Sequence, residues 1–222
     1  MAKENLVIIG SAGHAKVIID IVEKSNKYQI LGLIGLSHEI GQTLLSYEVL
    51  GTEEIIPSIM QAHPNCLFII ALGDNWKRSM VFHKVKAIYP DAEFATAIHP
   101  SAEIAQSVSI GKGVVVMAGA IINSSTVIGD FSIVNTKASV DHDNIFEEFS
   151  SIGPGATTGG NVTVQAFSAI CMGAVIKHGL TIATQSVIGA GALLLNNCPS
   201  YTISYGSPAK VIRNRIAGEN YL

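Results

Sequence analysis

The sequence predicts two parts of different class: an α/β domain over residues 1–95 and a parallel β solenoid over residues 96–222. Two observations predict this division. Up to residue 95, short apolar segments alternate with segments of helical spacing, which is typical of a parallel sheet covered by helices. From Ile98 onward the apolar residues recur with a period of six, which neither a helix nor an ordinary strand produces. A fixed internal period of this kind indicates a solenoid.

The first part has room for only about half of a dinucleotide-binding fold, so we expect a half-Rossmann-like domain. Its strands are short and apolar, and its helices carry apolar residues three and four positions apart. The expected elements are a strand at Leu6–Ile9, a tight turn at Gly10–Gly13, a helix at Ala15–Lys24, a strand at Ile30–Ile34, a helix opening at Thr52 as N-cap, a strand at Leu67–Leu72 and a helix at Trp76–Ile88.

The second part repeats every six residues from Ile98 to Leu194. Fifteen of its seventeen positions at this spacing are Ile, Val or Leu, and the exceptions are Phe146 and Thr158. The residue four places later is usually Ala or Ser. Six residues form one short side, and three sides close a triangular coil of about 18 residues that stacks on the next at about 4.8 Å. The aliphatic row is expected to fill the axis of five to six coils.

Composition excludes several classes of protein. The chain is 48% apolar and 14% charged, with a mean hydropathy of +0.40, which excludes intrinsic disorder. Its apolar runs are far shorter than the roughly 20 residues that span a bilayer, and its net charge of −3 without a basic stripe argues against a nucleic-acid partner. Three cysteines without metal-ligand spacing predict neither a disulfide framework nor a metal site. With too few apolar residues before Gly10 for a signal peptide, we expect a cytoplasmic protein.

The six-residue repeat resembles the hexapeptide-repeat acyltransferases, whose fold is a left-handed parallel β-helix. Three further segments, Val7–Ala15, Ala71–Asn75 with Arg78, and Ile98–Ala102, are similar to one subfamily. It contains N-acetyltransferases of nucleotide-linked 4-amino sugars, of the bacillosamine and perosamine types, and sialic acid O-acetyltransferases. The resemblance implies acetyl-CoA as co-substrate and a homotrimer with active sites between subunits. The low charge content also favours a surface buried against another copy.

His142 is the candidate catalytic base. It lies two residues after Val140 of the aliphatic row, so it is expected at a corner with its side chain outward. Transfer of an acetyl group to an amine needs a base, and histidine has a suitable pKa. Asp143 can orient the imidazole, as the resemblance also implies. Gly160 stands 18 residues after His142, so its N–H is a candidate oxyanion donor one coil away. The alternatives are a solvated corner histidine and a glycine that only permits a turn.

A glycine-rich turn joins the first strand to the first helix. Such a turn lets backbone N–H groups approach a phosphate, helped by the helix dipole. The alternative is a tight turn that binds no ligand. The resemblance implies that this turn and the end of the third strand hold the nucleotide of the sugar substrate. The candidate substrate-binding residues are Gly10, Ser11, Gly13, His14, Gly73 and Asp74, with Asn135 implied by the resemblance in the solenoid.

The C-terminal segment Gly206–Lys210 is similar to the CoA signature of the family. Pro208 is expected to end the last coil, and Lys210 is expected, with Arg213 and Arg215, to bring positive charge toward the CoA phosphates. The alternative is a capped terminal helix that seals the solenoid. The resemblance also implies contacts from the backbone N–H groups of Met172 and Ala190, which are 18 residues apart, to the pantetheine arm.

The leading functional hypothesis is N-acetylation of the 4-amino group of a nucleotide-linked 4-amino-4,6-dideoxy sugar, with UDP favoured, by direct attack and a histidine base. The alternatives are O-acetylation of sialic acid or another sugar hydroxyl, and a non-catalytic scaffold that binds a nucleotide sugar. The chain departs from the subfamily at two places. The second strand ends in Leu33–Ser37 without the usual acidic residues, and Ser151 stands where many members have a second histidine.

Overall fold

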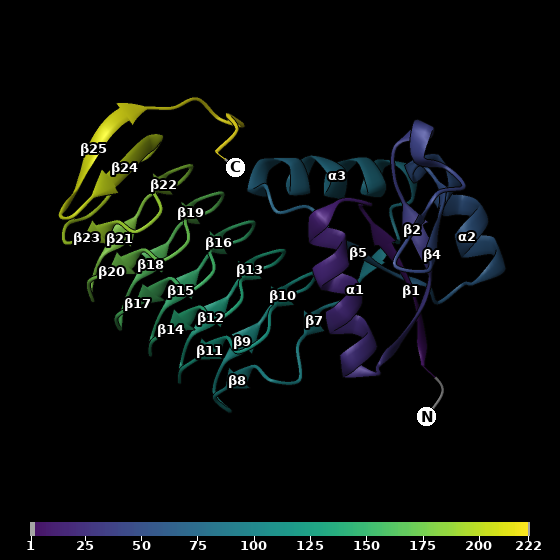
Figure 1. The fold of residues 1–222 in the computed structure, drawn as a ribbon, viewed down its shortest axis with the longest axis horizontal. Helices are drawn as coiled ribbons and strands as arrows, with labels where there is room; N and C mark the ends of the chain where they lie inside the picture. The colour runs from purple at the N-terminus through teal and green to yellow at the C-terminus, as the bar shows by residue number, and fades with distance from the viewer. Residues whose placement is uncertain (1–2, 222) are drawn as a thin grey trace. The chain divides into compact units, whose positions relative to one another are not determined.

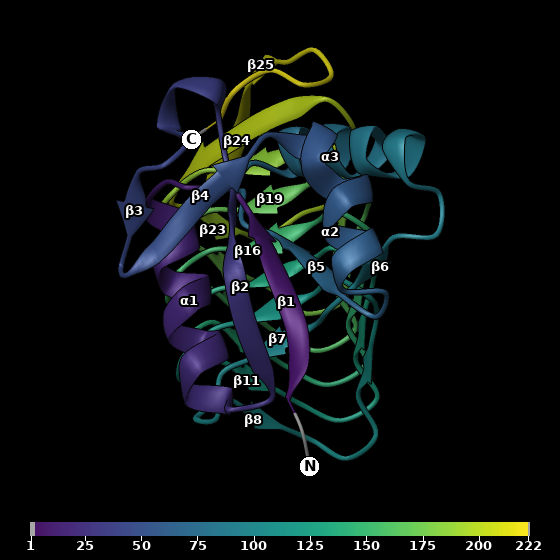
Figure 2. The same cartoon turned by 90° about the vertical axis from the view of Figure 1, so that its right-hand side faces the viewer.

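A computed structural model of the chain describes residues 3–221 (Figure 1). The N-terminal part forms a six-stranded sheet in the order β3-β4-β2-β1-β5-β6, parallel except for the β3–β4 pair. Figures 1 and 2 show α1 and α2 on opposite sides of this sheet. The elements are β1 (Glu4–Ile9), α1 (Gly13–Ser25), β2 (Tyr28–Ile34), the 3₁₀ turn η1 (Ser37–Glu39), β3 (Thr43–Leu44), β4 (Tyr47–Gly51), the 3₁₀ turn η2 (Glu53–Ile55), α2 (Ile56–Ala62), β5 (Leu67–Ile70), α3 (Asn75–Ile88) and β6 (Glu93–Phe94).

The register of the central strands places their C-terminal ends together. Ile9 of β1 is opposite both Ile34 of β2 and Ile70 of β5. These strands are apolar on both faces because helices cover both, which is the pattern of a buried parallel sheet. The loops that follow the three strands therefore lie at one edge of the sheet, where open α/β sheets bind their ligands.

The expected capping role of Thr52 is wrong. Its hydroxyl donates to the carboxylate of Glu54 instead of accepting from a helix N–H, and the chain first makes the 3₁₀ turn η2. Helix α2 starts only at Ile56, with Pro57 in its first turn, where a missing N–H costs nothing. The other expected helices and strands are present, with ends that differ by a few residues.

The second part is a parallel β-helix of two-residue strands. From β8 to β22 it makes five complete three-sided coils, and β23 with an isolated bridge at Cys198 begins a sixth. The first side consists of β10 (Val115–Val116), β13 (Ile133–Val134), β16 (Ser151–Ile152), β19 (Ala169–Ile170) and β22 (Val187–Ile188). The second consists of β8 (Glu103–Ile104), β11 (Ile121–Ile122), β14 (Ser139–Val140), β17 (Thr157–Thr158), β20 (Val175–Ile176) and β23 (Leu193–Leu194). The third consists of β9 (Ser109–Ile110), β12 (Val127–Ile128), β15 (Ile145–Phe146), β18 (Thr163–Val164) and β21 (Thr181–Ile182).

Paired residues in successive coils differ by 18. Ile122 pairs with Val140, and Val140 with Thr158. The aliphatic row is buried from Val116 to Leu194 and only half-buried in the first coil, where no earlier coil of the solenoid covers it. The predicted period, side length and number of coils therefore agree with the structure, and apolar burial along the axis is the main force that holds the coils together.

The C-terminal segment is a β-hairpin, not the end of a coil or a terminal helix. Strand β24 (Thr202–Gly206) extends the first side in parallel with β22, and β25 (Ala209–Asn214) returns antiparallel to β24. Pro208 lies in the turn between them, so the expectation that it ends the last coil is wrong. Proline suits such a turn because it has no N–H to pair.

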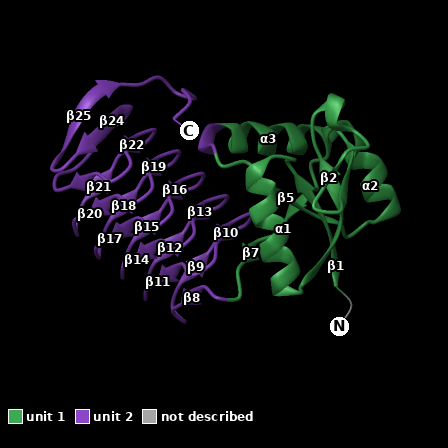
Figure 3. Cartoon of the chain, in the orientation of Figure 1, with its two compact units in different colours: residues 1–73, 77–100 green, residues 74–76, 101–222 purple. Residues whose placement is uncertain are grey.

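Contacts divide the chain into two units (Figure 3). The first comprises the residues up to 73 with 77–100, including the short strand β7 (Ala97–Ile98), and the second comprises 74–76 with the residues from 101 onward. Among the described residues, no helix has the length and apolar character needed to cross a membrane. Residues 3–221 also hold no group of three or more His, Cys, Asp or Glu side chains that could bind a metal ion.

Candidate active site

His142 lies at the corner of residues 141–144 that follows β14, with its side chain outside the prism. Its Nδ1 is 2.6 Å from Oδ2 of Asp143, and both side chains are about half exposed. The hydrogen bond to Asp143 raises the pKa of His142, and the charge of Asp141 adds to this effect. Within residues 3–221, Nε2 has no hydrogen-bond partner. With Nδ1 facing a carboxylate and Nε2 open, the imidazole has the arrangement of an oriented general base.

Gly160 lies directly against this imidazole. A Cβ atom at Gly160 would lie 2.5 Å from Cε1 and 2.6 Å from Nε2 of His142, closer than any real contact allows. Only glycine therefore lets the ring stack on the next coil. The Gly160 N–H donates no hydrogen bond within the described part of the chain. The structure thus places an oriented histidine and an available backbone donor one coil apart.

Three other candidates lie on a different edge of the prism. Asn135, Met172 and Ala190 follow strands of the first side, whereas His142 and Gly160 follow strands of the second side. Met172 and Ala190 are exposed, and their N–H groups make no hydrogen bond within residues 3–221. The two sets of candidates are separated by one side of the coil, so a single chain does not bring them together.

The turn after β1 has little space around its backbone. Gly10 has φ +129°, and a Cβ there would lie 2.8 Å from the Ala71 carbonyl oxygen after β5. Gly13 begins α1 with open space beside it, so its backbone can be approached closely. This turn therefore lies beside the end of β5, from which the chain continues to Gly73 and Asp74.

His14, in the first turn of α1, is largely shielded from solvent. Burial and the nearby Arg78 guanidinium lower the pKa of His14 to about 4, so the ring is neutral at pH 7. Its buried Nε2 has no hydrogen-bond partner among the described residues. A buried polar atom of this kind costs free energy unless a ligand satisfies it. Arg78 is itself buried, and its Nη1 donates to the carbonyl oxygens of Leu72 and Gly73. A neutral N–H donor near a buried cation suits an anionic ligand.

Glu39 is a residue that the sequence analysis missed. Its Oε2 accepts hydrogen bonds of 2.7 Å from the Ser11 hydroxyl and from the Leu36 N–H. Gly35 permits this approach, because a Cβ there would lie 2.8 Å from the same oxygen. The expected acidic residue is absent from the strand end Leu33–Ser37, but η1 folds the chain back and brings Glu39 to the glycine-rich turn. An acidic residue within one 3₁₀ turn of the strand was the available signal.

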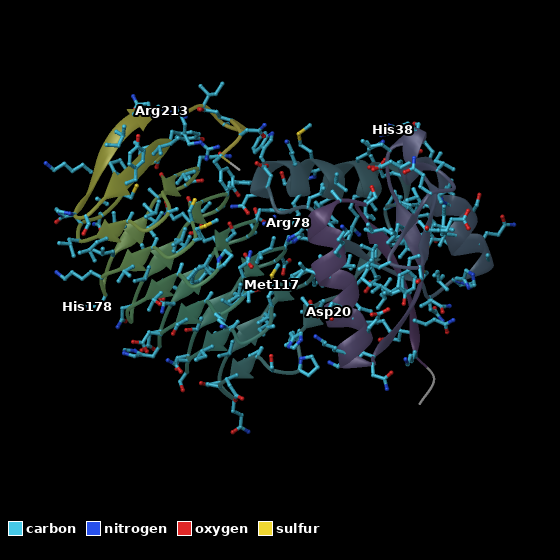
Figure 4. All side chains as sticks on the ribbon, in the orientation of Figure 1. Asp20, His38, Arg78, Met117, His178 and Arg213 are labelled. Carbon is cyan, nitrogen blue, oxygen red and sulfur yellow. The ribbon has the colours of Figure 1, made fainter. Side chains whose placement is uncertain are left out.

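The three C-terminal cations differ in exposure. Lys210 on β25 is exposed. Arg213, also exposed, forms an ion pair with Glu219, and Figure 4 shows its side chain at the outer surface of the hairpin. Arg215 is only 6% exposed and donates from Nη1 to the Gln185 carbonyl oxygen. The expectation that Arg215 offers its charge to CoA is wrong, because its guanidinium satisfies backbone acceptors inside the fold.

The lowered pKa of His14 predicts a stability effect. The unfolded chain takes up a proton near pH 6.5, whereas folded His14 resists protonation until about pH 4. Stability is therefore fully present above pH 6.5 and falls as pH drops toward 4, by at most about 3 kcal/mol from this group. Urea unfolding at about pH 7.5 and about pH 5 should show a smaller loss for His14→Gln than for the wild type. Equal losses in both proteins would contradict the burial of a neutral ring.

Comparison with known proteins matches this architecture over its full length. The PglD N-terminal domain family matches residues 5–85. UDP-N-acetylbacillosamine N-acetyltransferase of Bacillus subtilis is 31% identical over 115 residues, which are 52% of each chain, so the match spans about half of that relative. A histidine-to-alanine variant of GDP-perosamine N-acetyltransferase from Caulobacter crescentus, solved with CoA and GDP-perosamine, superposes with a TM-score of 0.88 at 31% identity, covering 96% of this chain and 99% of the other.

A further solved structure supports the same assignment. The acetyltransferase domain of PglB from Neisseria gonorrhoeae, in complex with acetyl coenzyme A, has a TM-score of 0.86 at 30% identity and covers 95% of this chain and 100% of that domain. The likeness extends over both units and includes the left-handed β-helix. The chain therefore belongs to the hexapeptide-repeat acetyltransferases, in the subfamily that joins N-acetyltransferases of nucleotide-linked 4-amino sugars, of the bacillosamine and perosamine types, with sialic acid O-acetyltransferases, and its members use acetyl-CoA as co-substrate.

Proposed function

We propose that the protein transfers the acetyl group of acetyl-CoA to the 4-amino group of a nucleotide-linked 4-amino-4,6-dideoxy sugar, with UDP as the favoured nucleotide. The observation that carries the proposal is the arrangement of His142, Asp143 and Gly160 on two successive coils. The relatives act on or bind UDP- and GDP-linked sugars, and the N-terminal match is to the PglD domain, which supports this substrate class.

In the proposed reaction, Nε2 of His142 takes a proton from the amine as the amine nitrogen attacks the thioester carbon. Asp143, on Nδ1, stabilises the imidazolium that forms. The carbonyl oxygen becomes an oxyanion and accepts a hydrogen bond from the Gly160 N–H. Collapse of this intermediate forms the amide and expels the CoA thiolate, which takes the proton from His142. No acyl-enzyme forms, because the amine attacks the thioester directly.

The nucleotide is proposed to bind at the glycine-rich turn of the N-terminal unit. The N–H groups at the start of α1 and the His14 ring supply donors for the pyrophosphate, with Gly73 and Asp74 at the neighbouring strand end. Glu39 is proposed to face the ribose or base, because a carboxylate accepts from hydroxyl and ring N–H groups. The three cysteines are free thiols, which fits the proposed cytoplasmic location.

The substrate class is tested by thiol release from acetyl-CoA, with mass spectrometry of the products. UDP-, GDP- and dTDP-linked 4-amino sugars are compared with free sialic acid. We expect thiol release with the nucleotide-linked amino sugars, strongest with UDP, and an acetylated amine in the product. Release with sialic acid alone would favour O-acetylation. No release with any acceptor would favour a binding scaffold.

We further propose a homotrimer, because the candidate residues lie on two separate edges of one prism. A neighbouring copy can bring its Met172 and Ala190 edge to the His142 edge and so complete a site. Apolar residues on the outer faces of the second and third sides support such packing, since monomers rarely expose rows of them. They are Ile121 (42% exposed), Val175 (47%), Val127 (43%) and Ile145 (46%).

Sedimentation equilibrium is expected to report a mass of three chains. Ile121→Lys, which places a charge on the outer face of the second side, should yield smaller species and lower turnover, because an unpaired buried charge opposes association. Lys112→Glu, at another exposed position, is the control and should stay trimeric. A monomeric wild type that turns over substrate would contradict the shared site.

A further inference from the structure

Three buried polar side chains lie beneath the His142 corner. Thr158 interrupts the aliphatic row, Asn144 stands in the row of mostly small residues, and Thr126 occupies the same column one coil before Asn144. All three are at most 2% exposed. Buried polar groups cost free energy unless they are hydrogen-bonded, so their partners show what they do. We name these three residues the corner cluster.

Each member of the corner cluster bonds to the backbone beside His142. The Thr126 hydroxyl donates to the Asp141 carbonyl oxygen at 2.8 Å, and Asn144 Nδ2 donates to the same oxygen at 2.6 Å. The Asp141 N–H donates to the Thr158 hydroxyl at 3.3 Å. The residue that precedes His142 is thus bound at its donor and at its acceptor by side chains from three successive coils.

This pattern differs from the equivalent positions in adjacent coils. The Asn123 N–H donates to the Val140 carbonyl oxygen, and the Gly159 N–H to that of Ile176, each at 2.9 Å. Asp141 stands in the same column between them, but its N–H turns to a hydroxyl. The backbone path into the His142 corner is therefore set by the Thr158 side chain and not by the ladder alone.

Asn144 also reaches the coil that carries Gly160. Its Nδ2 donates to the Gly159 carbonyl oxygen at 3.1 Å, and its Oδ1 accepts from the Val162 N–H at 2.9 Å. One side chain thus bonds to the backbone on both sides of Gly160 and to the backbone before His142. It links the two corners whose spacing decides how the imidazole lies over the glycine.

We propose that Asn144 and Thr158, supported by Thr126, are positioning residues that hold the His142 imidazole and the Gly160 N–H in register for acetyl transfer. This inference rests on the proposed role of His142 as the base. A base and an oxyanion donor must meet the same reacting carbon, and a misplacement of about 1 Å can cost about 100-fold in rate. Rigid support of the groups that react is what such sites require.

The sharpest variant is Thr158→Val, which removes the hydroxyl and restores an aliphatic residue to the axial row. We expect unchanged or higher resistance to urea, kcat lowered about 10-fold, and KM for both substrates within about twofold of wild type. Thr158→Ser keeps the hydroxyl and should recover most of kcat. Asn144→Val, which introduces the residue type of Val162 one coil on, should lower kcat by up to about 100-fold.

The matched control is Ser132→Ala. The Ser132 hydroxyl donates to the Glu147 carbonyl oxygen at 2.9 Å, the same fifteen-residue step as Thr126 to Asp141, but at a corner without a candidate catalytic residue. Its kcat should stay at the wild-type value. A similar fall of kcat in Ser132→Ala would overturn the proposal, because any loosened coil would then suffice.

Two further outcomes separate this proposal from the proposed function. If Thr158→Val and Asn144→Val keep wild-type kcat while His142→Ala does not, the corner cluster has no positioning role and the base stands. If His142→Ala keeps wild-type turnover, the base is wrong and the positioning role falls with it. A lower kcat in Thr158→Val that Thr158→Ser fails to recover would also overturn the role of the hydroxyl.

Discussion

Replacing His142 with alanine is expected to lower kcat by about 10²–10⁴-fold, the usual contribution of a general base. An ammonium group has no lone pair to attack a thioester, so the step needs a proton acceptor in place. KM for acetyl-CoA and for the nucleotide sugar should change little, because His142 acts on the reacting amine. Steady-state kinetics with thiol detection measures both. Unchanged turnover would remove His142 from the mechanism.

His178 provides a matched control. It stands in the same column of corners two coils later, and Figure 4 shows it at the outer surface of its unit. His178→Ala should keep wild-type kcat. Since Asp143 raises the pKa of His142, kcat of the wild type should fall below a pH higher than that of an ordinary histidine. Asp143→Asn should move this fall to lower pH and also reduce the plateau, because the ring loses its orienting carboxylate.

Replacing Gly160 with alanine is expected to lower kcat by about 100-fold. The added methyl group would lie 2.5 Å from Cε1 of His142, so the imidazole must move away from the Gly160 N–H. Gly160 does not have a positive φ, so alanine fits its backbone and stability should be kept. Urea unfolding and kinetics on the same preparation separate the two effects.

A double-mutant cycle tests the cause of this loss. If the methyl group acts by displacing the imidazole, Gly160→Ala should cost far less in a His142→Ala background, because the displaced group is gone. Equal costs in both backgrounds would show that the methyl group blocks substrate instead. That result would place Gly160 in the binding site but outside the proposed pairing with His142.

The solenoid could be predicted in detail because its period is written in the sequence. Each coil buries an aliphatic row, and 18 residues per coil place residues 142 and 160 in one column without any knowledge of the rest of the fold. The alternation of strands and helices likewise predicted the N-terminal sheet. Fold class, subfamily and acetyl-CoA dependence are confirmed by the comparisons. The residue roles at the site stay predictions.

Some features depended on contacts that no short sequence pattern specifies. Glu39 reaches Ser11 only because η1 reverses the chain after β2, and Arg215 turns inward only because the final hairpin leaves Gln185 with a free carbonyl to satisfy. Thr158 reads in sequence as a flaw in the aliphatic row, yet its hydroxyl bonds to the backbone beside His142.

The sequence by itself therefore determined the stacking of coils and the column that holds the imidazole and the glycine, because repetition converts sequence spacing into spatial spacing. Tertiary structure alone decided which polar groups meet across coils and turns. The physical reason is that burial of apolar rows is non-directional and periodic, whereas hydrogen bonds between single side chains and backbone depend on atomic distances and angles.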